Sequence, residues 1–142
     1  MQLLDVNILV YAFREDAKDH PLFATWLEDL AASGAAFSAS ELVLSSFLRV
    51  VTNARIFRPA TPRSRAFAFA EAIRSHPSYI RVPAGPRHWE IFAQLCETAD
   101  ATGDLIPDAY HAALAIEHGC EWITADRHFA RFPGLRWRHP LD

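Results

Sequence analysis

Four acidic residues stand where predicted strands end or predicted helices begin. Asp5 ends the apolar run that opens the chain, and Asp126 follows the predicted strand at residues 120–124. Asp108 and Glu41 lie in the first turns of two predicted helices. The carboxyl ends of parallel strands meet at one edge of a sheet, where α/β proteins bind their ligands. We therefore predict that Asp5, Asp108 and Asp126 lie together at that edge, with Glu41 as a candidate fourth acid.

Such a group of carboxylates needs a counter-charge. Neighbouring carboxylates repel one another, so at least one pKa must rise unless a cation joins them. A set made only of oxygen ligands favours Mg²⁺, with Mn²⁺ as a substitute. A divalent ion of this kind lowers the pKa of bound water and offsets the charge of a phosphate. The predicted chemistry is therefore the metal-dependent hydrolysis of a phosphodiester bond.

Each acid also has a plainer explanation, and these alternatives stay open at this stage. An acid in the first turn of a helix complements the helix dipole by about 0.3–1 kcal/mol, which would account for Asp108 or Glu41 alone. Asp126 alone fits an ordinary turn. The chain would then be a catalytically silent module that binds RNA or protein. A phosphatase of the haloacid dehalogenase kind needs a second Asp where this chain has Asn7, and His111 is predicted to be a satisfied, partly buried residue rather than a ligand.

The apolar pattern predicts strands that alternate with helices. Short apolar runs predict strands that end at Asp5 or span residues 35–38, 78–82, 120–124 and 135–137. Apolar residues at helical spacing, with their caps, predict helices at residues 8–13, 86–101 and 107–118, and helices that begin near His20, Ser40 and Thr61. This alternation is typical of βαβ crossovers. We predict one α/β domain over residues 1–142, with a mainly parallel central sheet flanked by helices.

The composition indicates a folded protein. The chain has 142 residues, of which 51% are hydrophobic and 22% are charged, so it can bury a core and is not disordered. No apolar stretch approaches the roughly 18 residues of a membrane span, and no basic leader with a cleavage site opens the sequence. We therefore expect a cytoplasmic protein without membrane association. Cys96 and Cys120 lie outside any CxxC pattern, which argues against a metal–thiolate site.

The basic residues are unevenly distributed. The net charge is −3, from 14 basic and 17 acidic residues, and all of the basic residues except Lys18 are Arg. Two segments contain several Arg and no acid: Arg49, Arg55, Arg58, Arg63 and Arg65 in one, and Arg127, Arg131, Arg136 and Arg138 in the other. Arg binds phosphate through two parallel hydrogen bonds. These segments are expected to hold a nucleic-acid backbone near the acids, although the sequence does not say which Arg takes part.

Taken in order, these motifs resemble those of the PIN-domain ribonucleases, and more narrowly the VapC toxins of type II toxin–antitoxin systems. The segments that carry the resemblance are Leu4–Asn7, Phe47–Asn53, Pro107–Ala115, Thr124–Phe129 and Phe132–Trp137. Each segment alone is a weak signal, but the ordered set is specific and covers essentially the whole chain.

The resemblance implies a Mg²⁺-dependent endoribonuclease toxin. It implies that Asp5 and Asp108 are metal ligands and that Asp126 completes the acidic cluster. Asn7 would support the first Asp, and Thr124 matches the hydroxyl residue before the last one. The implied partners are an RNA substrate such as transfer RNA or ribosomal RNA, a VapB-like antitoxin and a second copy of the chain.

One position departs from the family pattern. The resemblance places a Glu inside the second-motif helix, where this chain has Ser46. The nearest acid, Glu41, lies five residues earlier, which is a rotation of about 500° around a helix. Either Glu41 reaches the centre from the helix start, or the centre works with three acids and fewer metal ions.

Overall fold

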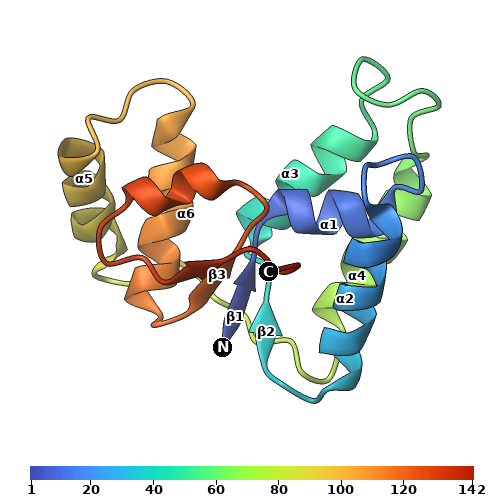
Figure 1. Cartoon of the computed structure of the whole chain (residues 1–142), viewed down its shortest axis with the longest axis horizontal. Helices are drawn as coiled ribbons and strands as arrows, with labels where there is room; N and C mark the ends of the chain where they lie inside the picture. The colour runs from blue at the N-terminus through green and yellow to red at the C-terminus, as the bar shows by residue number, and fades with distance from the viewer.

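The short apolar runs form a four-stranded parallel sheet in the computed structural model, which describes residues 1–142 (Figure 1). The strands are β1 (Gln2–Leu4), β2 (Phe37–Ser38), β3 (Glu121–Ile123) and β4 (Trp137–Arg138). Their order in the sheet is β2-β1-β3-β4, and every neighbouring pair is parallel. The first strand of the chain is therefore central, and its carboxyl end lies between the ends of β2 and β3.

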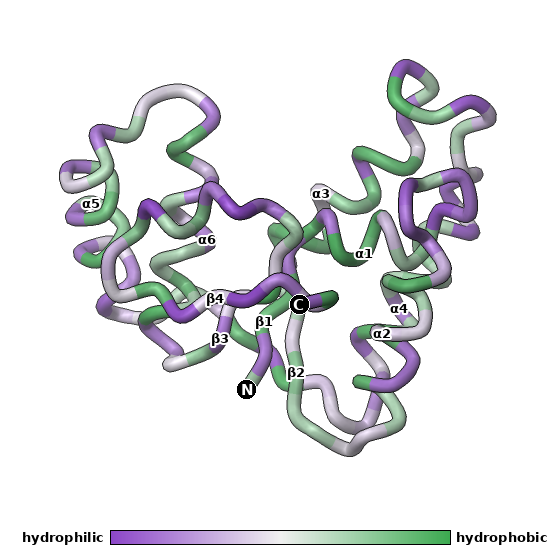
Figure 2. Tube along the Cα trace, in the orientation of Figure 1, coloured by the Kyte–Doolittle hydropathy of each residue, from purple (hydrophilic) through white to green (hydrophobic).

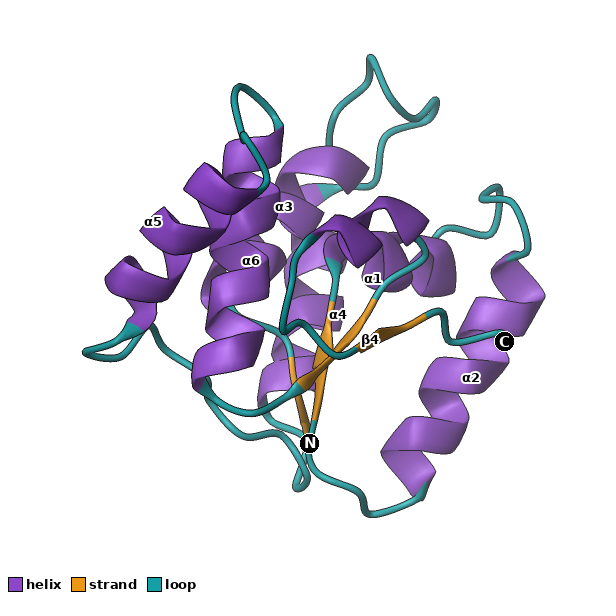
Figure 3. Cartoon of the chain, turned by 60° about the vertical axis from the view of Figure 1, so that its left-hand side comes forward, coloured by secondary structure: helices purple, strands orange, loops and turns teal.

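Helices cover the sheet on both sides. They are α1 (Val6–Phe13), α2 (His20–Ala32), α3 (Glu41–Val51), α4 (Arg63–Arg74), α5 (His88–Thr98) and α6 (Leu105–Glu117), with a 3₁₀ helix, η1 (Arg127–Arg131), after β3. Figure 3 shows α2 on one side of the strands and α6 with α5 on the other. This arrangement confirms the predicted α/β class with a parallel sheet flanked by helices. None of the helices combines the length and apolar character needed to span a membrane.

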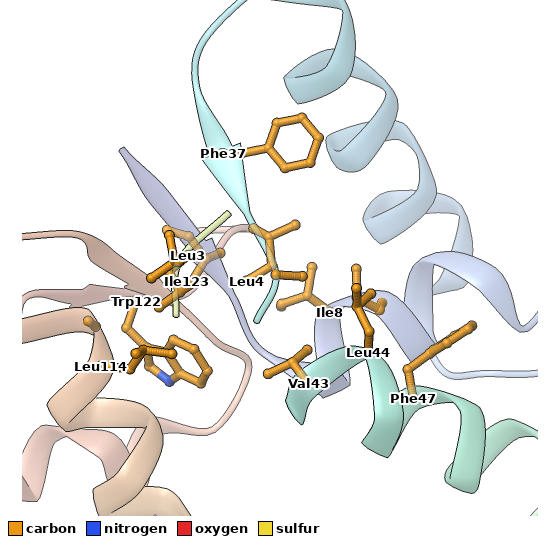
Figure 4. Packing of buried hydrophobic residues seen from close by; sticks show 14 of the residues in the cluster. Leu3, Leu4, Ile8, Phe37, Val43, Leu44, Phe47, Leu114, Trp122 and Ile123 are labelled. Carbon is orange, nitrogen blue, oxygen red and sulfur yellow. The ribbon is translucent and has the colours of Figure 1, made fainter. Parts of the chain in front are cut away.

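The core is built around β1 and the helices that leave the carboxyl edge of the sheet. Leu4 and Ile8 are fully buried, as is Val43 at the start of α3. Figure 4 shows these side chains and Leu44 gathered where β1, α1 and α3 meet. Burying a side chain of this size contributes about 1.5–3 kcal/mol. This packing holds the ends of β1, α1 and α3 rigidly relative to one another.

The strand predicted at residues 78–82 is wrong. Only Tyr79 makes a parallel bridge, to Phe37 of β2. The Phe37 N–H donates to the Ser78 carbonyl, and the Ile80 N–H donates to the Phe37 carbonyl. Because β2 itself contains only two residues, it offers no longer edge to which this segment could add a strand.

Helix boundaries also differ from the predictions. The helix predicted to begin at Pro107 begins at Leu105, because a proline in the first turn loses no intrahelical hydrogen bond. α1 begins at Val6 rather than Ile8, since the Asp5 side chain caps it. α5 is shorter at both ends than the predicted 86–101.

Candidate active site

The candidate site lies at the carboxyl edge of the sheet. β2, β1 and β3 are adjacent and parallel, so the residues that follow them meet at this edge. Asp5 directly follows β1, and Thr124 directly follows β3. Three elements that leave the edge begin with a side-chain cap: Asp5 caps α1, Ser40 caps α3, and Asp126 caps η1. Polar residues are thus concentrated here because three neighbouring elements start here.

Asp5 is a buried carboxylate with several donors. The whole residue is only 5% exposed to solvent. Oδ1 accepts from the Val6 N–H at 2.6 Å. Oδ2 accepts from the Thr124 hydroxyl at 2.6 Å and from the Asn7 amide at 3.0 Å. These three bonds fix the orientation of the carboxylate before any ligand binds.

Burial nevertheless raises the pKa of Asp5 to about 6. The main cause is the loss of solvent around the carboxylate. The hydrogen bonds from Thr124 and Val6 lower the pKa, and the charges of Asp108 and Asp126 raise it again. The loss of solvent therefore outweighs the hydrogen bonds to Asp5, and the two neighbouring carboxylates add a smaller effect in the same direction.

Thr124 and Asn7 connect the ends of β1 and β3. The Asn7 amide also donates to the Thr124 hydroxyl oxygen at 3.2 Å, and the Asn7 side-chain oxygen accepts from the Ala125 N–H at 3.1 Å. The Thr124 oxygen accepts from the Asp126 N–H at 3.0 Å. A single network thus ties Asp5 to the backbone of Asp126. Asn7 thus contacts the first Asp, as the family resemblance implies, and the part that Asn7 and Thr124 take in the chemistry stays a prediction.

Asp108 lies in the first turn of α6 and is half-buried. Partial burial raises its pKa, and the negative charge of Asp126 raises it further. Arg131 opposes this effect, while Asp104, the N-cap residue of the same helix, adds to it. Neither carboxylate oxygen of Asp108 accepts a hydrogen bond from the protein. Both oxygens are therefore available to a ligand.

Asp126 is held by the element that it caps. Its Oδ1 accepts from the His128 N–H at 2.9 Å and lies 3.1 Å from His128 Nδ1. Its Oδ2 has no protein partner. Asp108 and Asp126 are near enough to Asp5 for their charges to raise its pKa, and their joint role as metal ligands stays a prediction.

Glu41 is placed differently. It begins α3 at the same edge of the sheet, but its Oε1 accepts from Arg81 Nε at 2.8 Å in an exposed pair. It is not among the charges that shift the pKa of Asp5 or Asp108. Ser46, one and a half turns later, is half-buried on the same helix. Whether Glu41 takes part in the chemistry stays a prediction.

The acids suit a hard cation by their donor type, but they do not yet surround one. No three His, Cys, Asp or Glu side chains lie close enough together to hold an ion. Each of the three Asp residues does retain free oxygen lone pairs: one on Asp5 Oδ1, all on Asp108, and those of Asp126 Oδ2. A shared ion would therefore need small side-chain movements or bridging water.

Three features of the site add to the sequence predictions or differ from them. Arg131 belongs to the Arg-rich segment expected near the acids, but the sequence did not specify that its charge would act on Asp108. Asp104 precedes Asp108 by four residues, a spacing that could have placed it on the same helix face. The prediction that His111 is satisfied is wrong, because its Nδ1 has no hydrogen-bond partner. The residue is nevertheless buried and its ring stacks on Trp122, with 5.4 Å between the ring centres. Burial lowers the pKa of His111 to about 4.

The chain was compared with known proteins and structures. A family model described as "PIN domain" matches residues 3–135. Ribonuclease VapC25 of Mycobacterium tuberculosis is 45% identical over 140 residues, which cover 99% of each chain. VapBC2 from Rickettsia felis, solved with a DNA fragment from their promoter, aligns with a TM-score of 0.69 and 19% identity over 96% of each chain.

A further solved structure shares the fold. VapC20 of Mycobacterium tuberculosis, a toxin that cleaves the Sarcin-Ricin loop, aligns with a TM-score of 0.65 and 18% identity. The alignment covers 96% of this chain and 99% of that one. At such identities the likeness concerns the fold, whereas the relatives at 44–45% identity over nearly the full length also establish the family. The chain belongs to the PIN-domain family and, within it, to the VapC group.

Proposed function

We propose that the chain is the toxin of a toxin–antitoxin pair and a Mg²⁺-dependent endoribonuclease. The observation that carries this proposal is the buried Asp5, whose pKa rises to about 6 beside Asp108 and Asp126 at the carboxyl edge of the sheet. Burial is the main cause of this rise and the two neighbouring charges add to it, so a bound cation would offset both costs. The names of the relatives, which are ribonucleases, support the same reaction class.

The chain's own residues would hold the reacting groups. Thr124 and Asn7 keep the Asp5 carboxylate in one orientation, so this side chain need not reorient when the substrate arrives. Asp108 and Asp126 supply uncommitted oxygens on two further elements. Bound Mg²⁺, or Mn²⁺ in its place, would lower the pKa of water and offset charge on the phosphate. The products would be two RNA fragments, formed by hydrolysis of one phosphodiester bond.

The role of Glu41 depends on its partner. If the pair with Arg81 opened, the Glu41 carboxylate would be free at the start of α3. This helix follows β2, the strand next to β1, so Glu41 lies at the same edge of the sheet as the three Asp residues. If it stays paired, the centre would work with Asp5, Asp108 and Asp126 alone. With only these three acids, the centre would hold fewer metal ions than it would with Glu41 as a fourth ligand.

The proposed partners follow from the family. A VapB-like antitoxin is supported by the VapBC2 complex from Rickettsia felis. An RNA substrate, either ribosomal or transfer RNA, is supported in part by VapC20, which cleaves the Sarcin-Ricin loop. We further propose that the protein is a homodimer and that it is located in the cytoplasm. Each chain would form a single PIN-like domain.

One observation favours a second candidate, a catalytically silent module that binds RNA or protein. No three potential ligands are grouped closely enough to hold an ion, and the fourth acid is paired with Arg81. In this case the acids would only cap helices and shape the sheet edge.

A cleavage assay separates the two candidates. Wild type, Asp5→Asn and Asp108→Asn would be incubated with total RNA in Mg²⁺, in Mn²⁺ and in EDTA. Asp29→Asn, an exposed carboxylate on α2, serves as the matched control. We expect cleavage by wild type and the control only with metal, and none by the other two variants. A Glu41→Gln lane then shows whether that acid is needed.

The reverse result would refute the nuclease proposal. If wild type cuts no RNA in either metal, or if Asp5→Asn and Asp108→Asn cut as well as wild type, the acids do not perform this chemistry. Circular dichroism of each variant shows that loss of cleavage is not loss of folding. The silent binding module would then be the better description.

A further inference from the structure

The two Arg-rich segments differ in how many of their side chains are free. In the C-terminal segment, Arg127 is held by Asp142 through two hydrogen bonds of 2.8 and 2.9 Å. Arg138 donates to Glu121 at 3.2 Å, and Arg136 donates to the Gly119 carbonyl at 2.6 Å. Much of the positive charge in this segment is thus already compensated or anchored within the protein.

The first segment is the opposite case. Its Arg residues are all exposed, and none pairs with a carboxylate. Only Arg58 is anchored, because its Nε donates to the Ala54 carbonyl at 3.1 Å. No Asp or Glu occurs between Glu41 and Glu71, so the segment is positive throughout in a chain of net charge −3. We call the exposed side chains of Arg49, Arg55, Arg58, Arg63 and Arg65 the basic surface.

Two Arg residues of the basic surface lie at the start of a helix, where a positive charge is unfavourable. Arg63 and Arg65 lie in the first turn of α4. This turn contains no acidic residue, and no side chain caps the start of the helix. A cation there opposes the helix dipole by about 0.3–1 kcal/mol. Stability alone would favour acids at these positions, whereas a bound anion would be stabilised by the same helix end and by the two Arg residues.

The loop of the basic surface is held by Arg14, a partly buried arginine. Arg14, whose side chain is only 11% exposed, binds Asp16 through two hydrogen bonds of 2.8 and 2.6 Å. Its Nη1 donates to the Pro59 carbonyl at 2.9 Å and to the Thr61 hydroxyl at 3.1 Å. Its guanidinium also lies 4.4 Å from the centre of the Phe57 ring. Arg14 therefore fixes both the end and the inner side of the loop between α3 and α4.

Helix α1 links this clamp to the acids. Asp5 caps the start of α1, and Arg14 caps its end. At about 1.5 Å per residue, the two caps are roughly 13 Å apart along the helix axis. Figure 1 shows the loop between α3 and α4 beside the segment that follows α1, and Figure 2 shows hydrophilic stretches within that loop. The distance between the two caps of α1 corresponds to roughly four stacked nucleotides, at about 3.4 Å each along one strand.

We propose that the basic surface, positioned by Arg14, binds the phosphate backbone of the RNA a few nucleotides away from the cleaved bond. This inference rests on the proposed nuclease function for its substrate. It distinguishes the two Arg-rich segments, since the C-terminal one has fewer free charges. Arg14 itself is a positioning residue, because its donors are all used within the protein.

A salt-dependent binding assay tests the surface separately from cleavage. A fluorescein-labelled 20-nucleotide RNA of mixed sequence would be titrated with the full chain in EDTA, at several NaCl concentrations. Each phosphate contact to a single strand contributes about 0.7 to the slope of log affinity against log salt. We expect Arg55→Gln/Arg58→Gln to lower this slope by about 1.4. The charge-matched comparison, Arg127→Gln/Arg138→Gln, should leave it nearly unchanged.

Several outcomes would overturn the proposal. It fails if Arg55→Gln/Arg58→Gln binds RNA with the wild-type slope, or if only Arg127→Gln/Arg138→Gln lowers it. It also fails if wild type binds vesicles containing 30% phosphatidylserine but not RNA, because the surface would then serve a membrane. Cleavage is read separately: a chain that binds RNA through this surface without cutting it refutes the nuclease function and not the surface.

The clamp has its own test. Arg14→Lys keeps the charge but loses the two-bond contact, and Asp16→Asn, at an exposed position, weakens the same contact at lower risk to folding. We expect both to reduce RNA affinity several-fold at an unchanged salt slope, since the phosphate contacts remain but the loop is looser. Trypsin should also cut after Arg55 faster than in wild type. Wild-type affinity and wild-type trypsin cutting in both variants would show that Arg14 does not position the surface.

Discussion

Asp5→Asn offers a direct test of the cost of burying a charge at this sheet edge. The carboxylate is buried, and its pKa rises to about 6 from the ordinary value of 3.8. The substitution removes the charge and keeps an oxygen that can cap α1. It also removes an acceptor for Thr124 and Asn7, but the cost of that loss does not depend on the ionisation of residue 5.

The sign of the effect follows from proton linkage. Between the two pKa values the folded carboxyl holds a proton that the unfolded one has lost, so the free energy of unfolding falls as pH rises. The difference between 3.8 and about 6 corresponds to about 3 kcal/mol, at about 1.4 kcal/mol per pH unit. Because the unfolded carboxyl is mostly ionised already at pH 4.5, about 2 kcal/mol of this loss falls between pH 4.5 and 7.5.

The assay is urea unfolding of wild type and Asp5→Asn in EDTA at pH 4.5 and 7.5. The variant should gain about 2 kcal/mol relative to wild type between the two pH values. At pH 7.5, Mg²⁺ at a hundredfold excess over its dissociation constant should stabilise wild type by about 2.7 kcal/mol and the variant by much less. The Mg²⁺ measurement reports on the proposed ion without using activity.

Two results would refute this reasoning. If the stability difference between wild type and Asp5→Asn is the same at both pH values, burial does not disfavour the ionised form of Asp5. If Mg²⁺ stabilises both proteins equally, Asp5 does not hold the ion. Asp29→Asn, at an exposed site on α2, should show neither effect.

Three further predictions concern the residues around the acids. Thr124→Val should lower the free energy of unfolding by about 1–3 kcal/mol, because the buried Asp5 carboxylate loses its 2.6 Å donor; an unchanged urea midpoint would contradict this. Ser40→Ala should cost about 1 kcal/mol in thermal unfolding because it removes the side-chain cap of α3, and an unaltered melting temperature would show that the cap is not needed. Glu41→Gln should change stability by less than about 1 kcal/mol, since the pair with Arg81 is exposed on both sides, and a larger loss in urea would mean that this pair is structural.

The sequence predicted the elements with strong periodicity better than those at the edge of the sheet. The first strand and the helices that carry the core have regular apolar spacing, and the structure confirms them. The apolar run at residues 78–82 looked like a strand by the same pattern. It makes a single bridge at Tyr79, because strand formation depends on a partner edge that the sequence does not reveal.

The site shows the same division. Asp5, Asp108 and Asp126 could be placed at one edge from their positions after strands and at a helix start. Their common neighbourhood follows from a parallel sheet, which the alternation of elements already indicates. The pairing of Glu41 with Arg81 joins residues 40 positions apart, and no local pattern could predict it.

The sequence by itself indicated the parallel α/β class and placed Asp5, Asp108 and Asp126 at the ends of strands or the start of a helix. These depend on periodicity and on position relative to strand ends, which are local properties of the chain. The tertiary structure alone decided which Arg residues are free and how far the pKa of Asp5 rises. The physical reason is that burial and charge pairing depend on groups distant in sequence, as in the contact of Arg127 with Asp142 and of Arg14 with Pro59.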